Sequence, residues 1–331
     1  MRTFATRARV SGEREILQRL IAGPVSGDAL AQEAGLTRAA MWKRIEALRE
    51  AGMEIDARAG RGYALRQPVE LLQAEPIIDA LPPFVRAGLA SLEIAWSLDS
   101  TNSELLRREA PAHGVAALIA ERQTGGRGRR GKTWASPLAA HLYLSLSRQF
   151  SGGLARLGGL SLVAGVATVE ALHESGYTEV GLKWPNDLVV RGQKLGGLLV
   201  EGGGEHAGPA RAVIGLGLNV RMPEAMAATL DQPWIDLARL IDPPPSRNAV
   251  AARLLAHLLP ALDQFDAEGL APFLARYACF DALMDREVVV LMAGRSQIGV
   301  ATGIAEDGAL RVRIDGEERV FHAGEVSVRA Q

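Results

Sequence analysis

Hydrophobic residues near the start of the chain recur at helical spacing in three stretches. Residues 13–22 place apolar side chains on one helix face, and Gly23-Pro24 ends this helix. Ser26 is predicted to cap a short second helix. After a tight turn, Thr37 is predicted to cap a third helix that runs to Gly52.

Strand-like alternation replaces the helical spacing directly after the third helix. Residues 53–57 and 63–65 alternate around a basic turn, which predicts a β-hairpin. Two helices joined by a short turn, followed by such a hairpin, are typical of a winged helix-turn-helix. We therefore predict that residues 1–67 form a winged helix-turn-helix DNA-binding domain.

Strands and helices alternate through the middle of the chain. Strands are predicted at 92–98, 115–121, 141–147, 179–184, 188–190, 195–201 and 212–220, and helices at 102–109, 154–175, 248–268 and 270–278. Several of these strands are joined by turns of hairpin length, so the sheet should be mixed or antiparallel with helices packed on it. Residues 68–282 are predicted to form this central domain.

The last part of the chain reads as short strands alone. They are predicted at 287–292, 297–304, 309–314, 319–321 and 326–328, with turns at Asp307-Gly308 and Asp315-Gly316. Residues 283–331 are therefore predicted to form a small SH3-like β-barrel. The whole chain falls into the α+β class.

Composition narrows the class of protein. The 331 residues are 48% hydrophobic with a net charge of −1, but residues 1–66 hold twelve Lys/Arg against eight Asp/Glu. A basic first domain thus precedes an acidic body. Cys279 is the single cysteine, which excludes an internal disulfide, and we expect it to be buried as a small hydrophobe. No stretch is apolar enough to span a bilayer, so a cytoplasmic protein with no membrane partner is expected.

The cations of the first domain gather on the third helix and the hairpin, which indicates DNA as a partner. The predicted DNA-binding residues are Thr37, Arg38, Trp42, Lys43, Arg44 and Arg61. Trp42 is a bulky aromatic where a polar base-contacting residue is expected. Such helical modules also serve as protein docking surfaces, so a protein partner is the alternative to DNA, and no sequence specificity follows from these residues.

The most distinctive loop covers residues 123–137, where four glycines and four cations lie close together. Glycine lets the backbone approach a ligand, and Arg and Lys bind carboxylate or phosphate. Residues 126–133 satisfy the pattern G-x-x-x-x-G-K-T of nucleoside triphosphatases. That motif requires a following helix, whereas here Trp-Ala-Ser-Pro and an alternating run follow. A solvated basic loop is the other alternative.

Polar residues also stand at four strand ends. Ser100-Thr101-Asn102 precedes a helix and fits a capping box. Lys183–Asp187 fits a turn, Lys194 precedes paired glycines, and Asn219 ends an apolar strand where it can satisfy a backbone group. No catalytic triad, carboxylate dyad or histidine cluster is present. Chemistry at this site would depend on orientation and charge neutralisation.

Taken in order, these motifs resemble the biotin protein ligase family. They are Ser100 to Asn102, Gln123 with the glycine-rich loop, Trp134 with Ser136-Pro137, Lys183 to Asp187, Lys194 to Gly197, and Gly215 to Asn219. With the two terminal domains, the chain resembles the bifunctional bacterial form, which is both ligase and biotin-operon repressor. The resemblance implies the biotin ligase catalytic fold, similar to class II aminoacyl-tRNA synthetases.

The resemblance implies a two-step reaction with biotin and ATP as substrates and Mg²⁺ arriving with ATP, without a fixed protein metal site. Biotinyl-5′-AMP forms first, and biotin then passes to one lysine of the biotin carboxyl carrier protein of acetyl-CoA carboxylase. The family also implies a homodimer formed through the central sheet. The glycine-rich loop is expected to order over biotin and to couple adenylate formation to dimerisation and operator binding.

Residue roles follow from the same resemblance. The implied biotin-binding residues are Ser100, Thr101, Asn102, Gln123, Arg127, Gly128, Arg129 and Lys194. The implied catalytic or adenylate-binding residues are Arg129, Lys194, Trp134, Asn186 and Asn219. Two other classes compete: a P-loop triphosphatase joined to a winged helix, and a transcription factor whose central domain only senses a ligand.

Overall fold

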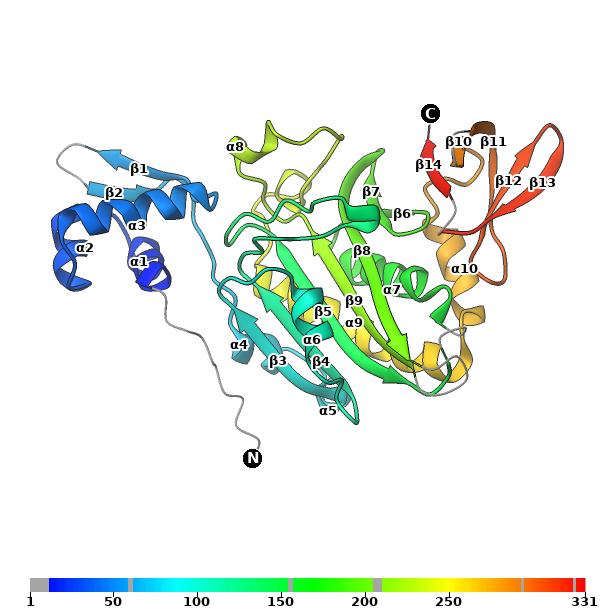
Figure 1. The fold of residues 1–331 in the computed structure, drawn as a ribbon, viewed down its shortest axis with the longest axis horizontal. Helices are drawn as coiled ribbons and strands as arrows, with labels where there is room; N and C mark the ends of the chain where they lie inside the picture. Colours follow the sequence, from blue (N-terminus) through cyan, green and yellow to red (C-terminus); the bar gives the residue numbers. More distant parts are fainter. Residues whose placement is uncertain are drawn as a thin grey trace.

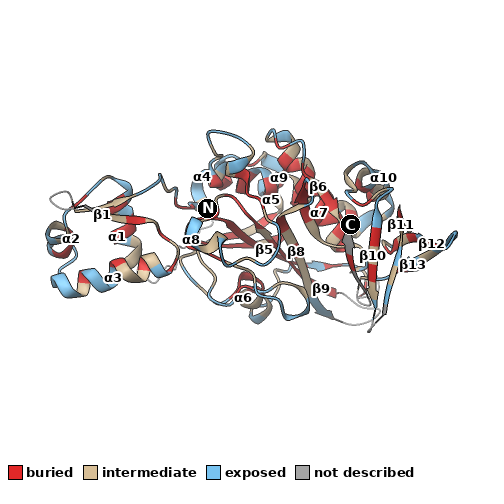
Figure 2. Ribbon diagram, turned by 90° about the horizontal axis from the view of Figure 1, so that it is seen from above, coloured by how far each residue is buried: buried red, intermediate tan, exposed pale blue. Residues whose placement is uncertain are grey.

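The computed structural model describes residues 12–58, 62–153, 157–204, 210–292, 295–323 and 326–330. Figure 1 shows three units in chain order: a small helical domain, a central sheet with helices, and a terminal β unit. Buried residues gather between the central sheet and its helices, whereas much of α3 is exposed (Figure 2). The predicted domain limits stay predictions.

The first domain is built as its sequence pattern predicts. It contains α1 (Gly12–Ile21), α2 (Gly27–Glu33), α3 (Arg38–Glu50), β1 (Ile55–Arg58) and β2 (Gly62–Leu65). Ser26 Oγ accepts from the Ala29 amide at 3.1 Å, and Thr37 Oγ1 accepts from the Ala40 amide at 3.2 Å. Both predicted helix caps are therefore confirmed.

A seven-stranded mixed sheet forms the centre of the molecule. Its strands, in spatial order, are β3 (Leu89–Ala95), β4 (Val115–Ala120), β5 (Leu142–Phe150), β9 (Ala210–Leu218), β8 (Gln193–Gly204), β7 (Asp187–Val190) and β6 (Gly181–Lys183). Only β3 and β4 run parallel; the other neighbours are antiparallel. The predicted mixed sheet is confirmed.

The two faces of this sheet differ in chemistry. Leu144, Leu216 and their even-numbered neighbours on β5 and β9 belong to the main hydrophobic core. Three long helices contribute to that core: α7 (Leu160–Glu174), α9 (Arg247–Glu268) and α10 (Ala271–Phe280). The odd-numbered face carries glycines and polar residues, and α6 (Thr101–Arg107) packs on it. One face thus builds the core and leaves the other for a site.

The terminal unit is a five-stranded antiparallel sheet. Its strands are β10 (Glu287–Met292), β11 (Arg295–Ile304), β12 (Leu310–Ile314), β13 (Glu317–Phe321) and β14 (Val326–Ala330), in the order β13-β12-β11-β10-β14. Gly308 and Gly316 have positive φ values of 85° and 83°, as the predicted turns require. The Trp184 indole donates to the Gly308 carbonyl at 3.0 Å and ties this unit to the central domain.

Short elements complete the connections. They are α4 (Ala74–Asp79), α5 (Pro83–Gly88), η1 (Arg129–Gly131), α8 (Glu224–Ala227) and η3 (Leu237–Arg239). Near α4, Glu121 accepts from the Leu72 amide at 2.6 Å and pairs with Arg247 at 2.7 Å. Both side chains are almost fully buried. Through Leu72, this pair fixes the linker, residues 66–73 between β2 and α4, to the central domain.

Some details of the sequence prediction are wrong. The strand predicted at 92–98 is β3, which spans Leu89–Ala95, three residues earlier. The helix predicted from residue 154 begins at Leu160, because Gly159 at φ 82° turns the chain immediately before it. Cys279 is exposed, because it lies on the outer side of α10, whose inner side buries Phe273 and Tyr277. Among the described residues, no helix is long and apolar enough to cross a membrane.

Candidate functional site

The start of α6 brings three predicted residues over the polar face of the sheet. Ser100 caps the helix, its Oγ accepting from the Ser103 amide at 3.4 Å. Thr101 and Asn102 are buried beneath it. Thr101 donates its amide N–H to Gln123 Oε1 at 2.8 Å, so the helix start is joined to the beginning of the glycine-rich loop.

Glycines make the floor under these side chains. Gly215 lies between Ser145 of β5 and Leu199 of β8, and a Cβ on it would overlap the Asn102 amide. Gly217 lies under Trp134, where a Cβ would come within 2.5 Å of the indole. Only glycine leaves room for Asn102 and Trp134 at these two positions. The spacing of glycines along β9 therefore shapes the pocket.

The glycine-rich loop folds as a turn against this floor. Arg127 and Thr133 form an isolated antiparallel bridge, and η1 occupies the tip. After Thr133 the chain forms no helix: residues 134–137 are irregular, residues 138–140 form a turn, and β5 follows. The triphosphatase alternative is therefore wrong, because helix N–H groups do not follow the lysine.

Two cations from different elements meet across the pocket. Lys194 Nζ donates to Asp187 Oδ1 at 2.7 Å and lies 5.5 Å from the centre of the Trp134 ring. Arg129 donates to Asn186 Oδ1 at 3.1 Å and also to the Ala323 carbonyl of the terminal unit. Burial, and then the neighbouring charge of Arg130, lower the pKa of Arg129. Its guanidinium still stays charged, as arginine does in proteins.

Ten predicted residues line one cavity of about 250 Å³. They are Ser100, Thr101, Asn102, Gln123, Arg127, Gly128, Arg129, Trp134, Asn186 and Lys194. The Trp134 Nε1 atom is buried and has no hydrogen-bond partner among the described residues. The cavity therefore joins polar groups at α6, an aromatic wall and cations at the opposite side.

Asn219 does not line this cavity. Its side chain donates to the Ile235 carbonyl at 3.1 Å and to the Lys194 carbonyl at 3.4 Å. These bonds hold the backbone of Lys194 in place, so Asn219 contacts the site through its neighbour. Asn219 thus satisfies backbone carbonyls at the end of a strand, which is the structural alternative given for it in the sequence analysis.

Three residues of the site were missed from the sequence. Asp187 pairs with Lys194, Glu201 accepts from Arg127 at 3.1 Å, and Ser145 is fully buried beneath α6. Asp187 stood within a quoted motif, whereas Ser145 and Glu201 lie inside strands. Alternate residues of a strand face the same side of the sheet, so Ser145 and Glu201 share the face of Gly215 and Gly197. This shared face was the signal in the sequence that could have identified them.

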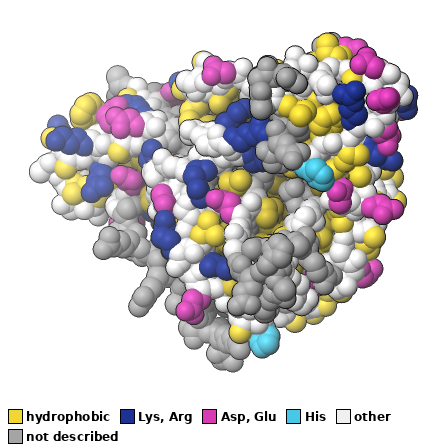
Figure 3. Space-filling model, turned by 45° about the vertical axis from the view of Figure 1, so that its right-hand side comes forward, with side chains coloured by type: hydrophobic (Ala, Val, Ile, Leu, Met, Phe, Trp, Pro, Cys, Tyr) yellow, Lys and Arg dark blue, Asp and Glu magenta, His cyan; other side chains and the backbone are white. Residues whose placement is uncertain are grey.

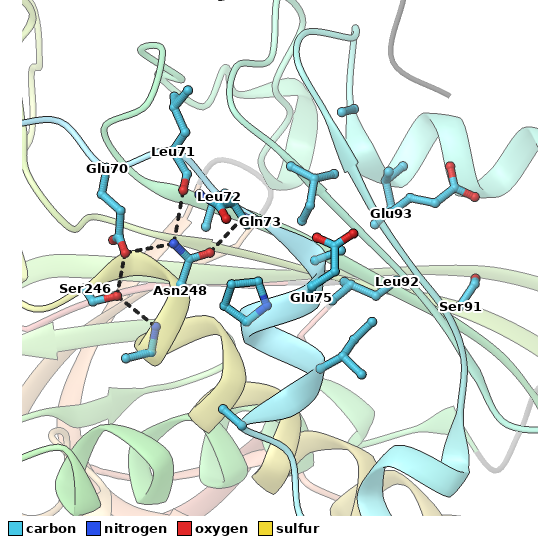
Figure 4. A pocket seen from close by; sticks show the side chains of 18 of the residues that line it. Glu70, Leu71, Leu72, Gln73, Glu75, Ser91, Leu92, Glu93, Ser246 and Asn248 are labelled. Atoms are coloured by element: carbon cyan, nitrogen blue, oxygen red, sulfur yellow. Dashed lines mark hydrogen bonds between the residues drawn. The ribbon is translucent and has the colours of Figure 1, made fainter. Parts of the chain in front are cut away.

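A larger groove of about 1450 Å³ lies between the linker, β3 and the start of α9. Figure 4 shows Asn248 bridging this groove: it donates to Glu70 Oε1 at 2.8 Å and accepts from the Gln73 amide at 2.8 Å. Ser246 also donates to Glu70 at 2.7 Å. These polar groups fasten the linker to α9, and none of the predicted site residues lines the groove.

The predicted DNA-binding residues lie on α3 and its cap, apart from Arg61, which lies outside the described residues. Trp42 is 54% exposed, and Lys43 is exposed beside it. Arg38 pairs with Asp28, and Arg44 lies 3.5 Å from Glu13. On the face with the terminal unit, acidic and basic side chains are interspersed (Figure 3).

Comparisons with known proteins agree with this geometry. Residues 95–219 match the biotin/lipoate A/B protein ligase family, residues 13–64 an HTH domain, and residues 284–329 the biotin protein ligase C-terminal domain. The chain is 38% identical to the bifunctional ligase/repressor BirA of Escherichia coli, over 92% of this chain and 93% of that protein. It is 34% identical to the biotin–[acetyl-CoA-carboxylase] ligase of Mycobacterium tuberculosis, over 72% and 90%.

A solved structure gives the same result. The biotin protein ligase of Aquifex aeolicus in complex with biotin and ATP is similar at a TM-score of 0.62 and 26% identity, covering 73% of this chain and all of that one. The fold and the pocket thus define a protein ligase of the biotin/lipoate class. Within that class, the chain belongs to the biotin protein ligase family, in its three-domain ligase/repressor form.

Proposed function

We propose that the protein activates biotin with ATP to biotinyl-5′-AMP and transfers biotin to one lysine of a biotin carboxyl carrier protein. The observation that carries the proposal is the convergence of Lys194, Arg129 and Trp134 on the cavity that begins at α6. A single pocket thereby offers polar groups for the ureido ring of biotin, cations for the biotin carboxylate and the ATP phosphates, and an aromatic surface for the adenine.

The first step brings two anions together. A biotin carboxylate oxygen forms a bond to the α-phosphorus of ATP, and the bond to the leaving pyrophosphate breaks. Arg129 and Lys194 offset the repulsion and stabilise charge on the phosphoryl oxygens. Lys194 donates to Asp187 at 2.7 Å, so it would exchange this carboxylate for the phosphoryl oxygens during the step.

The second step needs no protein nucleophile. The ε-amine of the carrier lysine attacks the acyl carbon, AMP leaves with the electron pair of the broken bond, and the amine loses a proton to solvent. The mixed anhydride is already reactive, so orientation of the amine is sufficient. The biotin carboxyl carrier protein of acetyl-CoA carboxylase is the proposed partner.

Magnesium is proposed to enter with ATP. No group of three or more His, Cys, Asp or Glu side chains in the described part of the chain could hold a metal ion by itself. Asp187 and Asn186 line the pocket and would supply oxygen ligands to the ion, and phosphate oxygens would supply the others. The ion would neutralise phosphate charge, and the protein side chains would orient the carboxylate and the α-phosphate.

The first domain supports a second role as a biotin-operon repressor. Helix α3 presents exposed Lys43 and Trp42, and in a helix-turn-helix the second of the two joined helices is the one that enters a DNA groove. A homodimer through the central sheet is part of the proposal, because β8 continues to Gly204 beyond its last pairing with β7 at Gly197. We place this activity in the cytoplasm, where the carrier protein and the operator are found.

One experiment separates the proposal from its alternatives. The protein is incubated with ATP, biotin and a carboxyl carrier domain, and biotin on the carrier, AMP and phosphate are measured. We expect biotin on the carrier and one AMP per transfer. A ligand-sensing transcription factor would bind biotin without consuming ATP, and that result would overturn the proposed ligase activity.

A further inference from the structure

Beneath the pocket, a row of polar side chains is joined by hydrogen bonds from the loop to β8. Ser145 is its centre: its Oγ lies 2.6 Å from Asn102 Oδ1 and 2.7 Å from Thr101 Oγ1. Ser145 is fully buried and does not line the cavity, so it acts on a ligand only through these two neighbours.

Partners that can only accept fix the orientation of the Asn102 amide. Its Nδ2 lies 2.9 Å from Glu201 Oε2 and 3.1 Å from the Leu199 carbonyl. A carboxylate and a carbonyl both lack a proton to give, so the Asn102 nitrogen must face them. The Asn102 oxygen then faces Ser145 and accepts its only proton.

The direction of the remaining bonds follows. Since Ser145 donates to Asn102, its oxygen must accept from the Thr101 hydroxyl. Gln123 Oε1 is the weaker acceptor for that proton, because it lies farther away, at 3.1 Å, and already accepts from the Thr101 amide. The Thr101 proton is therefore held by the closer Ser145 oxygen, at 2.7 Å. Thr101, which lines the cavity, therefore offers a bound ligand a lone pair.

We propose that Ser145 and Glu201 are positioning residues that make the Thr101 hydroxyl an acceptor. The pocket then selects a ligand that presents an N–H group to Thr101 over one that presents an oxygen. This inference rests on the proposed function, since the ureido ring of biotin carries two such N–H groups. Glu201 fixes the orientation of the Asn102 amide. Ser145 then donates to Asn102 and accepts from Thr101, so the Thr101 hydroxyl has a lone pair left for the ligand.

Ser147 offers a matched control on the same strand. It lies two residues further along β5, faces the same side of the sheet and is 1% exposed. Among the described residues its hydroxyl has one hydrogen bond, a long one of 3.4 Å accepted from Arg211, and none to Thr101, Asn102, Ser145 or Glu201. Ser147→Ala therefore removes an equally buried hydroxyl without changing the row.

The test compares Ser145→Ala with Ser147→Ala in the full-length protein by calorimetric titration. The probes are biotin, the two carbamate analogues in which one ureido N–H is replaced by oxygen, and ATP. We expect Ser145→Ala to weaken biotin binding roughly tenfold to hundredfold, because Asn102 loses its donor and Thr101 its acceptor. ATP affinity should stay within about twofold in both variants.

Selectivity gives the sharper readout. The wild type should bind biotin at least about tenfold more tightly than the analogue that places oxygen at Thr101. In Ser145→Ala the freed Thr101 hydroxyl can turn and donate, so this ratio should fall. A merely structural serine would lower both affinities together and leave the ratio unchanged, and that result would overturn the proposal.

A second pair of variants carries the test if Ser145→Ala does not fold. Glu201→Gln keeps an acceptor for Asn102, whereas Glu201→Leu removes it, and both lose the charge that pairs with Arg127. We expect the selectivity ratio to be retained in Glu201→Gln and reduced in Glu201→Leu. Equal ratios would refute the role of Glu201. Absence of biotin binding by the wild type would instead refute the proposed function.

Discussion

Two clusters of basic residues look alike in the sequence and differ in the structure. In the pocket, Arg129 and Lys194 come from separate elements and are held by Asn186 and Asp187. On α3, the predicted DNA-binding cations lie along one helix and are exposed, although Arg38 pairs with Asp28 and Arg44 lies 3.5 Å from Glu13. The difference teaches that a built site holds each cation among partly buried polar groups, whereas a DNA-reading face requires exposed charge that can exchange its surface partner for phosphate.

Exposure makes the same distinction in numbers. The Lys194 side chain is 21% exposed, whereas that of Arg38 is 80% exposed although it pairs with Asp28. An exposed pair of this kind contributes little to stability because water screens it. Cations in the pocket should therefore affect catalysis strongly, and cations on α3 should affect DNA binding by modest, salt-dependent amounts.

The largest effect should come from the most buried cation, Arg247. Glu121→Ala leaves its charge unpaired in the interior, which should lower the free energy of unfolding by about 3–5 kcal/mol. Denaturant unfolding measures this change. Glu179→Ala, which breaks the exposed pair with Arg191, is the control and should behave as an ordinary surface substitution. Equal losses in both variants would remove the proposed dependence on burial.

Alanine substitution of one lysine in the pocket and one lysine on α3 tests the comparison directly. Lys194→Ala should lower biotin transfer to the carrier by roughly 100-fold to 1000-fold, the cost of losing one donor to a developing anion. Lys43→Ala should transfer biotin normally but reduce the salt dependence of operator binding by about one phosphate contact. Transfer is measured on the carrier domain and DNA binding by gel shift over a salt series. Undiminished transfer by Lys194→Ala would contradict the site.

Retention of the adenylate tests the second pocket cation. Arg129→Gly removes the bonds to Asn186 and Ala323, so biotinyl-5′-AMP should leave roughly tenfold to hundredfold faster. The released adenylate should then label unrelated proteins. Release is followed by rapid filtration and labelling by blotting with bovine serum albumin as acceptor. Slow release in this variant would show that other groups close the pocket.

The effect that is smallest near neutral pH concerns a buried histidine that stays neutral. Burial lowers the pKa of His141 to about 3, and its Nδ1 accepts from the Val220 amide at 3.1 Å. The unfolded chain takes up this proton below its usual pKa near 6.5, whereas the folded protein does not. The free energy of unfolding should therefore decrease as the pH is lowered from about 6.5 toward 3, by up to about 1.4 kcal/mol per pH unit.

His141→Asn, which keeps an acceptor for Val220, should remove this contribution. Unfolding free energies measured between pH 7 and the acid limit should fall less steeply in the variant, after allowance for its lower overall stability. Carboxylates such as Glu121 are present in both proteins, so the difference between the two slopes reports His141 alone. Identical slopes would show that His141 takes up its proton in the folded state.

Much of this architecture was predictable because local signals agreed with one another. Ser26 and Thr37 as caps and the turns at Gly308 and Gly316 follow from residue chemistry at short range. Contacts that join distant segments were not predictable. Leu138, which follows the glycine-rich loop, is buried in the core of the first domain and donates its amide to the Ala51 carbonyl at 2.8 Å.

The site shows the same limit. Motifs located Thr101, Arg129 and Lys194, because short polar stretches at strand ends are visible in a sequence. Ser145 and Glu201 were missed, since each is one polar residue within a strand and gains its meaning from the neighbouring strands. Cross-strand partners depend on register, which the sequence of one strand does not give.

The two faces of strand β9 differ in the substitutions that they tolerate. Its even-numbered residues lie in the hydrophobic core, where aliphatic side chains of similar volume can replace each other with a small loss of stability. On the other side Gly215 and Gly217 tolerate nothing larger than a hydrogen atom. Every missense codon change at these two positions adds bulk, so evolutionary drift in β9 should be confined to alternate residues.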